Sequence, residues 1–311
     1  MNNVCVEPKP CNGGFDLGIL VQSSSRGVED DFNIEKNAIS EMVGRLNVKL
    51  DQVHVGLLLY SQRVKLYNSL KNSQQRTKSS FIEKVQDLPF VSYTYSPLYD
   101  GLMRSSTELF NQKRSYLVGK VAVLFNDAKS NPVSTNLTDA ANILKRDLNV
   151  EIVVVGVGND VSDIELNQIA SHPSNVIRVP TYEDLYKNLD LITQTVCTTN
   201  ARMSIDSEEY IRMGKNEFRY YKTSLTGITS MFLQIELTES RGKVNLFYSY
   251  EDKNPLIDSF KTSQQKTSFN EQTKVITNYF LIPNYGLPEI YFTIQSLEDS
   301  EVLVKVYEAD L

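Results

Sequence analysis

The chain has 311 residues, a length that predicts about two domains. Hydrophobic residues make up 41% and charged residues 23%, which is ordinary for globular protein and sufficient for two buried cores. The formal net charge of −6 argues against general nucleic-acid binding, which needs a basic face. We therefore expect no nucleic-acid partner. No run reaches the roughly 20 apolar residues that cross a bilayer, so we also expect no membrane insertion.

The first two thirds of the chain alternate apolar strands with amphipathic helices. The pattern predicts strands at residues 15–21, 54–61, 63–68, 120–127, 150–158 and 175–180, with 63–68 at an edge. It predicts helices at residues 28–46, 81–88, 97–110, 137–148, 161–170 and 182–197. Strands of near-continuous Val, Ile and Leu are typical of a parallel sheet covered on both faces. The predicted fold class is therefore α/β, a Rossmann-like, doubly wound, mostly parallel sheet.

After residue 198 the pattern changes. The polar stretch TTNARMSIDSEE predicts a linker, and short strands with period-two alternation follow at residues 217–224, 230–239, 242–251, 274–283, 289–296 and 301–309. Tyr and Phe are dense there and are expected to pack in the core. The prediction is a C-terminal all-β sandwich. We expect four parts: an N-terminal segment 1–11, an α/β domain 12–198, a linker 199–212 and a β-sandwich 213–311.

The three cysteines, Cys5, Cys11 and Cys197, lack the spacing of a metal site. Two interpretations stay open: three unrelated buried thiols, or one disulfide between the N-terminal segment and Cys197. Such a disulfide would stabilise the fold by up to about 5 kcal/mol and place the protein outside the cytosol. The start, MNNVCVEPKPC, has no apolar signal region, so the protein is either cytosolic or begins after signal removal.

Polar residues follow several predicted strands at one edge of the sheet. Ligands on such sheets bind outside the carboxyl ends of the strands, so the relevant loops begin at Gln22, near Thr94 and at Asp127. The sequence contains no nucleophile elbow and no Gly-rich phosphate loop, and GVGND at 156–160 predicts a strand-to-helix turn. We therefore expect no catalytic residues and no enzyme activity.

Six stretches in order carry a family resemblance: FDLGILVQSSSRG, HVGLLLYSQRV, YTYSPLYDGL, KVAVLFNDAKSN, VEIVVVGVGN and ELNQIASHPSNVIRV. Together they make residues 12–198 resemble a von Willebrand factor type A domain. Domains of this family often carry a metal-ion-dependent adhesion site (MIDAS). Its pattern is Asp-x-Ser-x-Ser after the first strand, a Thr from a second loop and an Asp from a third.

This chain departs from that pattern at two positions. Gln22 stands in place of the first Asp, and Arg26 in place of the second Ser, whereas Ser24, Thr94 and Asp127 match. Gln22 removes a negative charge, and an Arg beside Asp127 would pair with it rather than share it with Mg²⁺. The resemblance therefore implies a degenerate site with no metal, or with weakly bound Mg or Mn. Its metal ligands would be Ser24, Thr94 and Asp127, and its ligand-binding residues Gln22, Ser24, Ser25, Arg26, Thr94 and Asp127.

The first turn of the helix at 28–46 is acidic. Asp30 and Asp31 are expected to be solvated carboxylates that suit the helix dipole, with rescue of the metal site as the other interpretation. The resemblance also implies a disulfide from Cys197 to Cys11, with Cys5 as the alternative partner. Asn136 begins the only N-glycosylation sequon and would be modified in a secreted protein.

The function implied by the resemblance is non-enzymatic adhesion in the extracellular matrix. The expected partner is a matrix protein, with collagen favoured, bound without a tightly held metal. One alternative is metal-dependent adhesion through the upper face of the type A domain. Another is a purely structural matrix or assembly component that self-associates. The expected location is extracellular, with the signal peptide already removed.

Overall fold

The structure is a computed structural model that describes residues 13–23, 28–49, 52–71, 77–91, 96–111, 118–130, 136–230, 232–256, 265–270, 275–281 and 288–309. The chain divides between Thr199 and Asn200 into an α/β unit and a β unit. Within the described residues, no helix is long and apolar enough to cross a membrane.

The α/β unit is built on a six-stranded sheet in the order β3-β2-β1-β4-β5-β6. Strand β1 pairs in parallel with β2, and β5 pairs in parallel with β4 and β6, while β3 is antiparallel at one edge. This confirms the predicted mostly parallel sheet. The bounds are β1 (Phe15–Gln22), β2 (His54–Tyr60), β3 (Val64–Asn68), β4 (Gly119–Asn126), β5 (Val150–Val157) and β6 (Val176–Val179).

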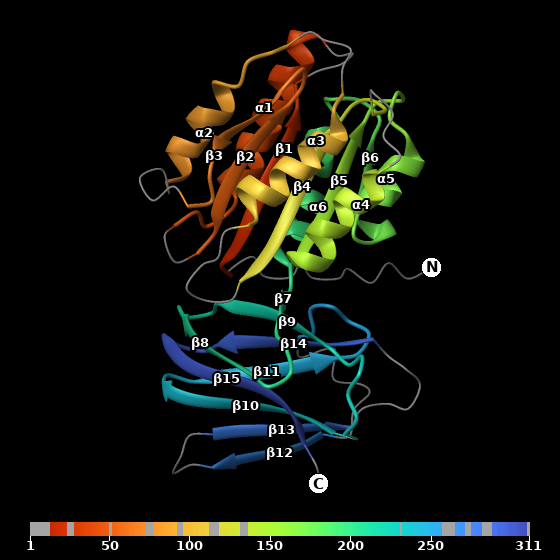
Figure 1. The fold of residues 1–311 in the computed structure, drawn as a ribbon. Coiled ribbons are helices and arrows are strands. Elements are labelled where there is room, and N and C mark those ends of the chain that lie inside the picture. Colours follow the sequence, from red (N-terminus) through yellow and green to blue (C-terminus); the bar gives the residue numbers. More distant parts are fainter. Residues whose placement is uncertain are drawn as a thin grey trace, which may run out of the picture. The chain divides into compact units, whose positions relative to one another are not determined.

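Helices cover both faces of this sheet, which is why every residue of β1 and β2 is buried. Figure 1 shows α3, α4 and α5 in front of the sheet and α1 and α6 behind it. The predicted helices at 97–110 and 137–148 each end in a π-helical turn, η2 and η3. The helical elements are α1 (Glu29–Gly44), α2 (Lys78–Gln86), α3 (Leu98–Arg104), η2 (Ser105–Leu109), α4 (Leu137–Asn142), η3 (Ile143–Asp147), α5 (Asp163–Ile169), η4 (Pro173–Asn175) and α6 (Leu185–Cys197).

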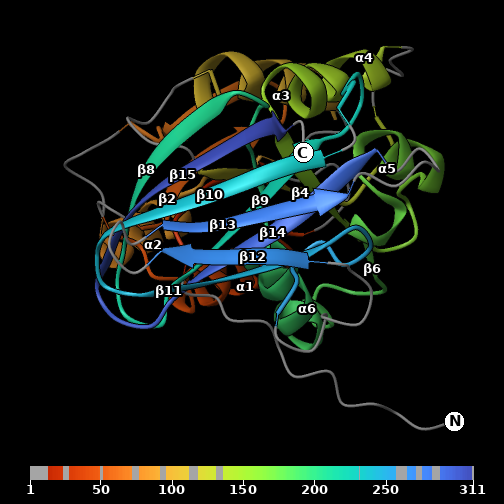
Figure 2. The ribbon, with the colours of Figure 1, turned by 90° about the horizontal axis from the view of Figure 1, so that it is seen from below.

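The β unit contains two sheets, as the period-two pattern predicts. One has the order β12-β13-β10-β15-β8 and the other β11-β14-β9-β7. Figure 2 shows the strands of the five-stranded sheet side by side. Alternate residues of both sheets meet in one buried cluster, as Val302, Val304 and Val306 of β15 illustrate. The bounds are β7 (Ala201–Arg202), β8 (Ser207–Met213), β9 (Phe218–Ser224), β10 (Phe232–Arg241), β11 (Val244–Ser249), β12 (Gln265–Asn270), β13 (Val275–Leu281), β14 (Glu289–Ser296) and β15 (Ser300–Ala309).

Residues 199–212 are not the linker that their polarity predicts. They contain β7, which pairs with β9, and most of β8, which pairs with β15 along an edge of its sheet. An edge strand keeps polar side chains on its solvent side, which hides its pattern, and only Ile211 and Met213 of β8 are buried. The sequence pattern also does not predict β12, another edge strand.

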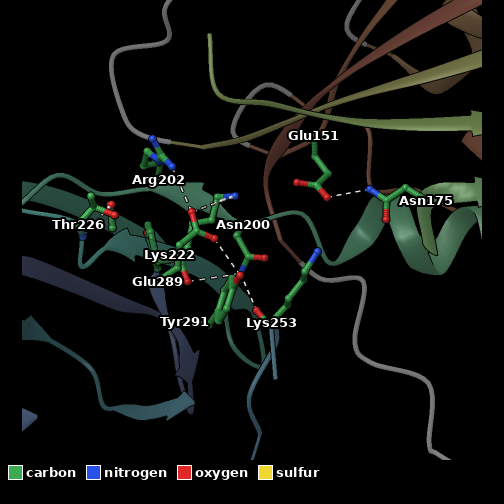
Figure 3. A network of polar contacts seen from close by, with 11 residues as sticks. Glu151, Asn175, Asn200, Arg202, Lys222, Thr226, Lys253, Glu289 and Tyr291 are labelled. Carbon is green, nitrogen blue, oxygen red and sulfur yellow. Dashed lines mark hydrogen bonds and ion pairs between the residues drawn. The ribbon is translucent and has the colours of Figure 1, made fainter. Parts of the chain in front are cut away.

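A polar network joins strands of the smaller sheet in the β unit (Figure 3). Glu289 pairs with Arg202 at 3.1 Å and with Lys222 at 3.7 Å, and it accepts a hydrogen bond from the Tyr291 hydroxyl at 2.8 Å. Burial alone would raise the pKa of the Glu289 carboxyl. The two cations and the hydroxyl outweigh burial and lower it. The network therefore links β7, β9 and β14 electrostatically.

Two paired glycines allow the η2 segment to pack closely on the sheet. Gly18 of β1 is the register partner of Gly56 of β2. A Cβ atom on Gly18 would lie 2.5 Å from the Phe110 ring, and one on Gly56 would lie 2.6 Å from the Leu109 side chain. Real Cβ atoms do not approach other atoms so closely, so a methyl group at either position would force the neighbouring side chain to shift.

We predict that Gly18→Ala lowers the free energy of unfolding by about 1–3 kcal/mol, because the added methyl group overpacks the core. Gly44→Ala is the matched control. Gly44 is the last residue of α1, and a Cβ atom added there would meet no neighbouring heavy atom within 4 Å. The same change there should raise stability by about 0.5–1 kcal/mol. Urea unfolding measures both, and equal effects at the two positions would contradict the packing argument.

Candidate functional site

The strand order reverses between β1 and β4, the two central strands of the α/β unit. From this switch point the sheet continues to β2 on one side and to β5 on the other, and folds of this kind bind ligands at such a point. The backbone N–H of Asp127, directly after β4, donates a hydrogen bond of 3.1 Å to Oε1 of Gln22, the last residue of β1. The structure thus brings together two of the predicted site residues. We call this end of the sheet the upper edge.

Ser23 fixes the start of the loop after β1. Its N–H donates to the Tyr60 carbonyl at 3.1 Å, which continues the pairing with β2. Its hydroxyl donates to the Pro89 carbonyl at 2.8 Å and accepts from the Val91 N–H at 2.9 Å. Ser23 is fully buried, so its hydroxyl holds the loop after β1 to the 89–91 segment and is not open to a ligand. Sequence reasoning assigned it no role.

A second buried network holds the loop after β4. The Tyr60 hydroxyl donates to the Phe125 carbonyl at 2.7 Å, and the Asn126 side-chain amide donates to the Ala128 carbonyl at 2.7 Å. Both side chains are 2% exposed or less. Burial raises the pKa of Tyr60, and the carboxyls of Asp127 and Glu35 raise it further. The hydroxyl therefore stays a hydrogen-bond donor.

Tyr182, just before α6, reaches the one predicted carboxylate of the site. Its hydroxyl donates a hydrogen bond of 2.9 Å to Oδ2 of Asp127, which is 8% exposed. Burial raises the pKa of Tyr182, with further contributions from Glu35 and Asp127, so the hydroxyl keeps its proton. One Asp127 oxygen is thus already engaged by the protein. No local pattern signals this contact, because Tyr182 lies 55 residues beyond Asp127.

Glu35 is a second carboxyl near the upper edge, and sequence reasoning missed it. It lies on α1 and is 3% exposed, on the same buried stripe as Phe32, Ile39 and Met42. Burial raises its pKa well above the ordinary value, and the charge of Asp127 raises it further. The sequence does carry a signal for Glu35, because a carboxyl occurs at a position of α1 where the helical spacing predicts an apolar core residue.

The described residues do not fit a tightly bound divalent cation. Mg²⁺ requires about six oxygen ligands. Among the described side chains, no group of three or more His, Cys, Asp or Glu could hold a metal ion. The Gln22 oxygen and one Asp127 oxygen already accept hydrogen bonds. One hydroxyl differs: Ser96, in the loop before α3, is fully buried and its Oγ has no hydrogen-bond partner among the described residues.

Ser24, Ser25, Arg26 and Thr94 lie outside the described residues, as do Cys5 and Cys11. Cys197, at the end of α6, is disulfide-bonded, and the identity of its partner stays a prediction. Asn136 is exposed at the start of α4, where a glycan would meet solvent. Asp30 is exposed in the first turn of α1, and Asp31 accepts a hydrogen bond from the Val28 N–H at 3.3 Å, so both act as helix-start carboxylates.

We predict that Glu35→Leu raises the free energy of unfolding at pH 7 by about 1–3 kcal/mol, because it removes an acid whose burial disfavours its charged form. The folded protein holds a proton on Glu35 that the unfolded chain releases near pH 4.5, so the cost of Glu35 grows as pH rises above that value. Urea unfolding between about pH 4.5 and 8 should therefore show a gap between variant and parent that widens with pH. Glu183→Leu, at an exposed position, is the control. A stability difference between Glu35→Leu and the parent that does not change with pH would contradict the raised pKa of Glu35.

Two curated relatives are matrix proteins by name. The chain is 29% identical to the collagen alpha-6(VI) chain of Homo sapiens over 247 residues, which cover 70% of this chain and 10% of that protein. It is 33% identical to matrilin-1 of Gallus gallus over 180 residues, which cover 56% of this chain and 35% of that protein. The chain thus spans a tenth of the collagen relative and about a third of the matrilin.

A solved structure has the same fold. Proximal thread matrix protein 1 from the mussel byssus superposes with a TM-score of 0.55 at 22% identity, covering 60% of this chain and 46% of that chain. Another structure of that protein has a zinc-occupied MIDAS motif. The family model of the von Willebrand factor type A domain matches residues 16–191. This match, together with the strand order and the contact of Gln22 with Asp127 at the switch point, shows that the chain belongs to the von Willebrand factor type A domain family.

Proposed function

We propose that this protein is a non-enzymatic adhesion component of the extracellular matrix. Its type A domain would bind a protein ligand, with collagen favoured, and would do so without a tightly bound metal. The observation that carries the proposal is the upper edge itself. There Gln22 replaces a carboxylate and is bonded to the Asp127 backbone, while Tyr182 bonds the Asp127 side chain. Of the oxygens that a cation would need, that of Gln22 and one of Asp127 already accept hydrogen bonds from the chain.

The matrix assignment is supported by the relatives and by Cys197. The curated relatives include collagen VI chains and matrilin-1, and the similar solved structure is also named as a matrix protein. Disulfides persist in oxidising compartments, so the disulfide-bonded Cys197 supports an extracellular location. Pairing of Cys197 with Cys11, or with Cys5, and glycosylation of Asn136 are part of the same proposal.

Arg26 has a defined role in the metal-free form of the proposal. Its guanidinium would pair with Asp127 and supply the positive charge that a cation supplies in other members of the family. Asp127 is the matching carboxylate, and it is largely buried. An ion pair of this kind would hold the upper edge in one conformation with no metal bound.

Metal-dependent adhesion is the second candidate, and one observation favours it. Ser96 carries a buried hydroxyl with no hydrogen-bond partner among the described residues, in the same loop as Thr94. Such a group is costly unless a ligand completes its bonding. In this form, weakly bound Mg or Mn would use Ser24, Thr94 and Asp127. The mussel protein supports this candidate. It has a similar fold, it is named as a matrix protein, and one of its structures has a zinc-occupied MIDAS motif.

Surface plasmon resonance against fibrillar collagen, run in Mg²⁺ and again in EDTA, tests the proposal. We predict equal binding in both buffers, because the interaction would not pass through a cation. Binding that is lost in EDTA and on Asp127→Ala would select the metal-dependent form. No binding in either buffer would remove collagen as the partner. It would favour a structural assembly role, which sedimentation would reveal as concentration-dependent self-association.

A further inference from the structure

Strand β8 of the β unit lies at an edge of its sheet. It pairs with β15 along one side, and among the described residues it is the last strand of the five-stranded sheet. Figure 2 shows β8 at this edge, beside β15. The side of an edge strand that faces away from its sheet presents backbone N–H and C=O groups that can pair with another strand. The free side of β8 is therefore a candidate surface for strand addition.

Three exposed side chains of β8 lie on the face of the sheet that points away from the buried cluster: Glu208, Tyr210 and Arg212. The Glu208 carboxylate lies 3.8 Å from Nζ of Lys305 on β15, and the Arg212 guanidinium lies 3.3 Å from the Glu301 carboxylate on β15. Most of each charged side chain stays open, because that of Glu208 is 67% exposed and that of Arg212 is 77% exposed. Each can therefore take a second partner on the free side of β8.

The charges of β8 are complementary to themselves. A carboxylate lies two residues before Tyr210 and a guanidinium two residues after it. Residues directly opposite each other in an antiparallel pair interact, so unlike charges stabilise the pair and like charges oppose it. If β8 pairs antiparallel with β8 of a second copy about Tyr210, Glu208 of each copy lies opposite Arg212 of the other. Pairing centred on Glu208 or on Arg212 would place like charges opposite each other, so the charges select one register.

The alternation of charge continues across the sheet. Two rows of charged residues cross the outer face from β10 through β15 to β8, and the sign alternates along each row. When two copies pair about Tyr210, the first row of one copy runs into the second row of the other with no like charges opposite each other. The first row is Glu236, Lys305 and Glu208, and the second row is Arg241, Glu301 and Arg212.

We infer that two copies of this chain associate by antiparallel pairing of their β8 strands, which joins the two five-stranded sheets into one. The inference concerns the β unit and holds whether or not the type A domain binds collagen. The same strand serves both copies, so the contact is symmetric and closes at two chains. One strand pair buries little surface, so the association is weak and depends on concentration. A pair of chains carries two type A domains, which would raise avidity for a ligand with repeated sites.

The test is sedimentation velocity of the full chain over a range of concentrations, for the parent and for two variants, Glu208→Lys and Arg212→Glu. Free thiols are alkylated first, so that no new disulfide joins two copies. The parent should form dimers as its concentration rises. Each single variant should dimerise roughly tenfold more weakly or worse, because like charges then lie opposite each other at two places in the pair.

An equimolar mixture of the two variants is the decisive sample. In a mixed pair, the new lysine of one copy lies opposite the new glutamate of the other, and the unchanged Arg212 lies opposite the unchanged Glu208. Dimers should therefore return in the mixture at close to the strength of the parent. A variant that had lost its fold could not give this recovery. Glu251→Lys is the matched control, because Glu251 is exposed and follows β11 at an edge of the other sheet, and it should dimerise like the parent.

Three outcomes would overturn the inference. The first is a parent that stays monomeric at every concentration. The second is single variants that dimerise as strongly as the parent, which would place the contact on another surface. The third is single variants that lose the dimer without recovery in the mixture, which would show that the residues at 208 and 212 do not meet between copies. The collagen measurement is separate, so failure of either proposal leaves the other open to its own test.

Discussion

The arrangement of the candidate site depends on one constraint, the reversal of strand order between β1 and β4. The reversal sets the switch point at the ends of the two central strands, and the bond from the Asp127 N–H to Gln22 joins these ends. Around this bond, Ser23 anchors the 89–91 segment and Tyr182 reaches Asp127. Loops that are distant in sequence are thereby fixed at the same edge of the sheet.

At this edge, polar groups of the protein bond one another. Hydrogen bonds within the chain satisfy Ser23, Tyr60 and Asn126. The buried hydroxyl of Ser96, in the loop before α3, has no hydrogen-bond partner among the described residues. Because unsatisfied buried groups reduce stability, they mark where a ligand can contribute most.

The sequence predicts the α/β unit well, because strands covered on both faces are continuously apolar and their helices have a clear apolar stripe. It fails at β8, where an edge strand keeps polar residues such as Glu208 and Glu209 facing solvent. For the site, pattern matching places Gln22 and Asp127 together. It misses Glu35 and Tyr182, because a tertiary contact between distant segments leaves no local pattern. For Glu35 a signal existed, since a carboxyl occurs where the helical spacing expects an apolar residue.

Hydrogen exchange read by mass spectrometry, on the full chain with and without collagen in EDTA, tests the central claim most directly. That claim is that the upper edge of the type A domain receives the ligand without a metal. The account predicts slowed exchange at residues 127–130 and 180–184, which follow β4 and β6 at the upper edge, with no change at the opposite end of the sheet. Protection confined to residues 200–309 of the β unit, or protection that appears only after Mg²⁺ is restored, would contradict it.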